Sequence, residues 1–100
     1  MPSTRTNLAR ATNHSLVTAA GLALSANDGR VNGLIQNLSA DKLYVKKGLS
    51  CSASDFTCIL VPGTAADDGY GGTLPLSGYL GPVSIFSAGT VRCMASEDIA

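Results

Sequence analysis

The residues of this chain best suited to bind a ligand lie in one short run, Asp67 to Gly72, with the sequence DDGYGG. Adjacent carboxylates on a glycine-rich turn offer oxygen ligands of the kind that Ca²⁺ prefers. The run lacks the alternating carboxylates and the distal glutamate of a calcium loop, however, and aspartates in such turns often accept hydrogen bonds from their own backbone. We therefore predict a contact surface here, with no metal and no cofactor.

Tyr70 gives this loop a second kind of chemistry. An aromatic ring between glycines brings a large contact area at low cost in conformational entropy, which suits recognition of a protein or a sugar. The alternative is that the ring folds back over the core as a lid. Together with Asp67 and Asp68, the tyrosines Tyr70 and Tyr79 are candidate partner-binding residues.

Catalytic chemistry has little support in the sequence. The single histidine, His14, has no Asp or Glu within several residues. A catalytic triad assembles in space, so residue order alone excludes none, but the chain has no G-x-S-x-G nucleophile elbow. The cysteines lack zinc-site spacing. We expect Cys58 and Cys93 to be small buried side chains, and a Cys51–Cys58 bridge stays open as an alternative. We predict that the protein is not an enzyme.

The charge balance limits the classes of partner. Seven Lys and Arg side chains match seven Asp and Glu, so no net field attracts a polyanion, and nucleic acid is not expected as a partner. No run approaches the ~18 apolar residues of a membrane span, so no membrane is expected either. Glu97 and Asp98 are expected to form an acidic patch with the terminal carboxylate, and this patch could pair with the basic start of another subunit.

Residues 1–12 are predicted to be an extended N-terminal arm. After Met1 they contain two arginines and one large apolar side chain, and they lack the apolar middle of a signal peptide. Such a segment cannot offset the entropy of its own ordering, but it can add a strand to a partner or fill a groove. Arg5, Leu8 and Arg10 are therefore further candidate contact residues.

Short apolar runs separated by turn residues predict an all-β fold. Seven or eight short strands with these spacings are typical of a small antiparallel β-sandwich, which residues 13–100 are predicted to form as a single domain. The expected strands cover residues 14–18, 22–25, 30–38, 42–46, 56–61, 73–77, 83–86 and 91–95, the last two as a pair. The side chains expected to face inward are Leu24, Ile35, Leu43, Val45, Ile59, Val83, Ile85 and Val91.

Several strand and turn motifs resemble those of small virion proteins of tailed bacteriophages. In that family an arginine after a turn opens a strand containing I-Q-N, and a short turn then leads to a strand that ends in L-Y-V and a glycine. The matching features here are Ala26–Arg30, Leu34–Ser39, Leu43–Val45, Gly48, Ile59–Gly63, the glycine-rich loop, Tyr79–Ile85 and an acidic finish at Glu97. The likeness spans roughly residues 13 to 97.

The resemblance implies a β-sandwich structural protein of the virion, assembled in the host cytoplasm. We expect a capsid decoration or cement protein, with the major capsid protein or other virion subunits as partners and a homo-oligomer on the particle. Two alternatives are a receptor- or carbohydrate-binding module of a fibre or tail, and a component of a head–tail joining ring. The resemblance carries no catalytic residues across.

Overall fold

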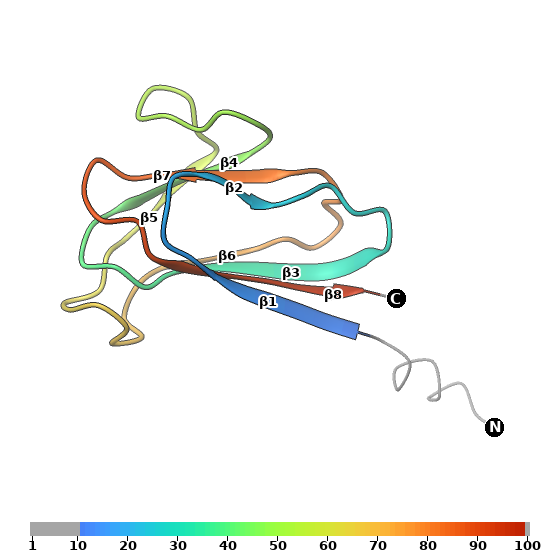
Figure 1. Cartoon of the computed structure of the whole chain (residues 1–100), viewed down its shortest axis with the longest axis horizontal. Coiled ribbons are helices and arrows are strands. Elements are labelled where there is room, and N and C mark those ends of the chain that lie inside the picture. Colours follow the sequence, from blue (N-terminus) through green and yellow to red (C-terminus); the bar gives the residue numbers. More distant parts are fainter. Residues whose placement is uncertain (1–10, 100) are drawn as a thin grey trace.

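The structure, a computed structural model, describes residues 11–99 of the chain. These residues form two four-stranded antiparallel sheets without helices, which confirms the predicted small β-sandwich (Figure 1). The strands are β1 (Ala11–Val17), β2 (Gly21–Leu24), β3 (Arg30–Asn37), β4 (Leu43–Lys47), β5 (Cys58–Leu60), β6 (Thr73–Pro75), β7 (Val83–Phe86) and β8 (Cys93–Ile99). Within the described residues, no helix is long and apolar enough to cross a membrane.

The chain passes repeatedly between the two layers. The strand order is β1-β8-β3-β6 in one sheet, here named sheet A, and β2-β7-β4-β5 in the other, sheet B. Among strands adjacent in the sequence, only β4 and β5 pair with each other. The expected pairing of β7 with the last strand is therefore wrong. Both strands carry buried apolar side chains, and the two lie on opposite sides of the shared core, in different sheets.

The strand bounds differ most from the prediction at β1 and β8. β1 begins at Ala11, so Ala11 and Thr12 belong to the sandwich and not to the predicted arm. β8 continues through Glu97 and Asp98 to Ile99. The two strands extend together because they pair along their whole length, with Ala11 opposite Ile99. Arg5, Leu8 and Arg10 lie outside the described residues.

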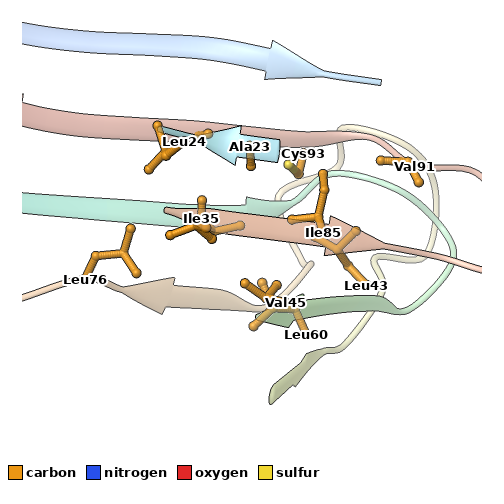
Figure 2. Close-up of a cluster of buried hydrophobic side chains, with 12 residues drawn as sticks. Ala23, Leu24, Ile35, Leu43, Val45, Leu60, Leu76, Ile85, Val91 and Cys93 are labelled. Atoms are coloured by element: carbon orange, nitrogen blue, oxygen red, sulfur yellow. The ribbon is translucent and has the colours of Figure 1, made fainter. Parts of the chain in front are cut away.

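The core between the sheets is aliphatic. Small and medium side chains from both sheets meet there, as Figure 2 shows, and they fit the roughly 10 Å spacing of packed sheets. The buried set comprises Ala23, Leu24, Ile35, Leu43, Val45, Leu60, Leu76, Val83, Ile85, Val91, Cys93 and Ala95. The inward-facing residues predicted from the sequence are confirmed, with the exception of Ile59.

Ile59 faces the outside of sheet B. It is 42% exposed, whereas its neighbour Leu60 is buried at 6%. Successive side chains of a strand point to opposite faces, so Leu60 and the half-buried Cys58 share the inner face and exclude Ile59 from it. The prediction placed the adjacent residues Cys58 and Ile59 inside together, which this alternation does not allow.

Truncation of buried residues tests this register. We expect Ile35→Ala and Val45→Ala each to lower the free energy of unfolding by about 1–4 kcal/mol, because each removes buried methyl groups and leaves a cavity. Ile59→Ala is the matched control and should cost clearly less, since this side chain is partly in water already. Urea denaturation followed by circular dichroism measures all three. Equal losses for Ile35→Ala and Ile59→Ala would contradict the register.

Candidate protein-binding surfaces

The loop between β5 and β6 is held in shape by Asp68. One carboxylate oxygen accepts hydrogen bonds from the backbone N–H groups of Thr64 at 2.7 Å and Ala65 at 2.8 Å, and the other accepts from Tyr70 N–H at 2.9 Å. These hydrogen bonds hold the pKa of Asp68 below its ordinary value, and the bond from Tyr70 N–H has the largest effect. The charge of Asp68 is therefore used to fix the backbone on both sides of it.

Asp67 ties the same loop to Arg92, the residue just before β8. The Arg92 guanidinium donates from Nε to Asp67 Oδ1 at 2.7 Å and from Nη2 to Oδ2 at 2.8 Å, a two-pronged contact. This hydrogen bonding from Arg92 lowers the pKa of Asp67. Asp67 adopts a φ of 61°, a left-handed conformation that short polar residues such as aspartate tolerate.

The base of the loop rests directly on the end of β3. Asn37 N–H donates to the Gly72 carbonyl at 2.9 Å, and Asp67 N–H donates to the Leu38 carbonyl at 2.8 Å. A side chain at Gly71 would collide with the backbone carbonyl of Asn37. Glycine is therefore required at this position, and the loop has a fixed seat on sheet A.

The two candidate tyrosines have different environments. Tyr70 is 77% exposed, so the alternative in which its ring covers the core is wrong. Tyr79 packs against the core, its hydroxyl donates to the Pro82 carbonyl at 2.7 Å, and Lys47 Nζ lies 5.5 Å from its ring centroid. Tyr79 therefore supports the fold, and Tyr70 is the ring that this region leaves exposed.

Acid titration and mutation of Asp68 test the role of this carboxylate. We expect Asp68→Ala to speed amide hydrogen exchange across residues 64–70 because three backbone N–H groups lose their acceptor. Asp28→Ala, at another exposed aspartate, is the control and should leave that exchange unchanged. A folded-state pKa below the ordinary value means that the loop keeps its order in mild acid and loosens only as the pH falls through the lowered pKa. Unchanged exchange in Asp68→Ala would contradict this role.

The potential metal ligands and the thiols of the described residues do not form a site. Within residues 11–99 no three His, Cys, Asp or Glu side chains are placed to hold a metal ion. Cys51, Cys58 and Cys93 are all free thiols, so the Cys51–Cys58 bridge is not formed. Cys93 is fully buried, as expected, and burial raises its pKa to about 11. Its thiol is therefore neutral and protected at neutral pH.

Of the predicted acidic patch at the end of the chain, the terminal carboxylate lies outside the described residues, and both acidic side chains are hydrogen-bonded within the sandwich. Glu97 accepts a hydrogen bond from Arg30 Nε at 2.9 Å and is largely covered. Asp98 accepts from the Thr12 hydroxyl at 2.9 Å. Both carboxylates are thus engaged by neighbouring strands of sheet A, because β8 runs between β1 and β3.

An aromatic surface on the outside of sheet B was not predicted from the sequence. Both phenylalanines and one of the three tyrosines lie on this surface and not in the core. The ring centroid of Tyr44 is 5.0 Å from that of Phe56 and 5.9 Å from that of Phe86, and Ile59 pairs with Tyr44 across the strands. Alternation indicated that Tyr44 faces outward, but no local signal indicated that the other rings would join it.

No protein-family model, curated protein sequence or solved structure matches this chain. The fold and the surfaces described above define its class by themselves. It is a small antiparallel β-sandwich that displays a fixed loop with one exposed tyrosine and an aromatic outer face on sheet B.

Proposed function

We propose that this protein is a structural component of a virion that works by binding other protein subunits. More specifically, we propose a capsid decoration protein that binds the major capsid protein and stabilises the head. The observation that carries the protein-binding role is the 77% exposure of Tyr70 on a loop held by Asp68 and by the Asp67–Arg92 pair. Because the backbone that carries this ring is already ordered, less conformational entropy is lost when a partner covers it.

The sequence motifs supply the virion part of the proposal. Two residues in these motifs, Arg30 and Asn37, are buried and make several hydrogen bonds each, so this part of the resemblance lies in the framework of the sandwich. The glycine-rich loop that bears Tyr70 is also among the matching features.

The predicted arm supplies a second contact in this proposal. It now covers residues 1–10, since β1 begins at Ala11. The basic residues Arg5 and Arg10 would pair with acidic groups of the capsid, and Leu8 would enter an apolar recess. The arm leads into β1, an edge strand of sheet A.

Copy number on purified particles tests the proposed position. We expect quantitative mass spectrometry to find this chain in a fixed, high ratio to the major capsid protein, because a decoration protein repeats with the capsid lattice. A few copies per particle would contradict capsid decoration and favour a tail, fibre or joining ring. Absence from purified particles would contradict the virion proposal itself.

Binding of variants to capsids that lack this protein tests the contact residues. We expect Tyr70→Ala to weaken binding at least about tenfold, as removal of a central aromatic contact does at protein interfaces. Leu49→Ala, which truncates another strongly exposed apolar side chain, is the control and should bind normally. Deletion of residues 2–10 should weaken binding in a salt-dependent way, because exposed charge pairs are screened. Normal binding by both Tyr70→Ala and the deletion would contradict the assigned contacts.

A further inference from the structure

β1 is the one edge strand of the described residues that carries no protection against pairing. β5 and β6 each contain three residues, β6 includes Pro75, and the register of β2 shifts between Leu22 and Leu24. β1 contains seven residues, without proline or formal charge, and the side chains from Thr12 to Leu16 are all exposed. Sandwich proteins usually shorten, bend or charge such edges because their free N–H and C=O groups pair with other strands.

The hydrogen-bond pattern shows which backbone groups of β1 face outward. Gly33 accepts from Leu76 N–H at 2.8 Å, so its backbone groups face β6, and those of its neighbours in β3 face β8. The bond from Leu38 N–H to the Arg92 carbonyl, at 2.8 Å, agrees with this alternation. The same alternation applies to β8, whose residues face β3 and β1 in turn, and then to β1, which pairs with β8. The β1 residues whose backbone groups face the open edge are therefore Thr12, His14 and Leu16.

We propose that β1 pairs with β1 of a second copy of this chain, antiparallel about a two-fold axis at His14. His14 is the midpoint of Ala11–Val17, so this register uses all the outward backbone groups of both strands. It places His14 opposite its own counterpart and Thr12 opposite Leu16 of the second copy. The two sheets A then become one continuous sheet in which neither β1 remains an edge.

Charge and symmetry favour a second copy as the occupant. β1 contains no Lys, Arg, Asp or Glu, so an antiparallel pair of these strands brings no like charges together when His14 is neutral. An antiparallel strand pair is also self-complementary, and a two-fold contact of this kind closes without leading to a fibre. A charged or shortened edge would disfavour the same arrangement.

The pairing is expected to be weak in dilute solution. Two short strands that meet edge to edge bury less than the roughly 1,200 Å² of a stable protein interface. Copies held close together gain effective concentration, which strengthens such a contact without new interactions. The pairing is a property of two copies in solution, so it does not rest on the proposed virion function.

Disulfide trapping tests the register. In a Cys51→Ser/Cys58→Ser background, which leaves only the buried Cys93, we expect His14→Cys to form disulfide-linked dimers under mild oxidation at least about ten times faster than Thr12→Cys or Leu16→Cys. A self-opposed pair lies about 5.5 Å apart at Cα, within the range that a disulfide spans. A mixture of Thr12→Cys and Leu16→Cys should form the mixed dimer, because these two positions oppose each other.

The outcomes that overturn the proposal are specific. Equal trapping at the three positions would mean random collision, and faster trapping at Thr12 or Leu16 alone would mean a different register. Sedimentation of the parent chain should show a concentration-dependent dimer that His14→Lys abolishes. Asn13→Lys is the matched control and should retain the dimer, since Asn13 faces Ser15 of the second copy and not itself. A parent chain that stays monomeric at millimolar concentration would show that another strand, if any, occupies this edge.

Discussion

Arg30→Met is expected to lower the free energy of unfolding by about 3–5 kcal/mol, the usual cost of removing one partner from a buried ion pair. The Arg30 side chain is 0% exposed and donates to Glu97 Oε1 at 2.9 Å. It also donates to three backbone carbonyls, those of Ser25 at 2.7 Å, Tyr79 at 3.0 Å and Gly81 at 2.9 Å. Its loss takes a hydrogen-bond donor from four partly buried acceptors.

Thermal unfolding measures this effect directly. At about 4–8 °C per kcal/mol for a domain of this size, the melting temperature of Arg30→Met should fall by on the order of 15 °C or more. Arg92→Met removes a partly exposed arginine and is the control, with a small expected fall in melting temperature because its pair with Asp67 is accessible to solvent. The double variant Arg30→Met/Glu97→Met should recover part of the loss. Equal melting temperatures for Arg30→Met and the parent would contradict the assigned role.

Asn37→Ala is expected to cost about 2–4 kcal/mol, because a buried amide that serves several backbone groups is removed. The amide nitrogen donates to the carbonyls of Asp41 at 2.9 Å, Leu60 at 3.2 Å and Val61 at 3.2 Å. The amide oxygen accepts from Ser39 N–H at 3.0 Å and from the Ser39 hydroxyl at 2.9 Å. Asn37 thereby fastens the end of β3 in sheet A to the turn before β4 and to the end of β5 in sheet B.

Chemical denaturation of an isosteric variant separates hydrogen bonding from shape. Asn37→Asp keeps the volume but turns a donor that faces three carbonyls into an acceptor, so it should destabilise at least as much as Asn37→Ala. Ser39→Ala removes one hydroxyl of the same network and should cost only about 1 kcal/mol. An Asn37→Asp variant as stable as the parent would contradict amide donation as the source. Both Asn37 variants should also loosen the Tyr70 loop, which is seated on the Asn37 backbone.

The framework of strands was readable from the sequence because strand periodicity is local. Alternation in residues 42–46 placed Leu43 and Val45 in the core and Tyr44 outside it, and the structure agrees. Turn residues separated the strands, so the number of strands and their approximate positions could be predicted from the sequence. The error at Ile59 arose where β5 is short and apolar on both sides, so that its neighbours gave no period to follow.

The roles of the candidate site residues depended on partners far away in the sequence. The run DDGYGG indicated an exposed loop, but the sequence could not separate Asp67, which pairs with Arg92, from Asp68, which binds backbone N–H groups nearby. It also could not separate the exposed Tyr70 from Tyr79, which packs on the core. The difference is made by residues that only folding brings together.

By itself the sequence determined the all-β class, the approximate strands and most of the core, since these follow from side-chain alternation and turn chemistry within a few residues. The tertiary structure alone decided which strands pair, because pairing is set by how two apolar faces fit across the core. It likewise decided that Glu97 is the partner of Arg30, 67 residues away, and that the aromatic rings gather outside sheet B. Contacts of this separation leave no local pattern from which they can be inferred.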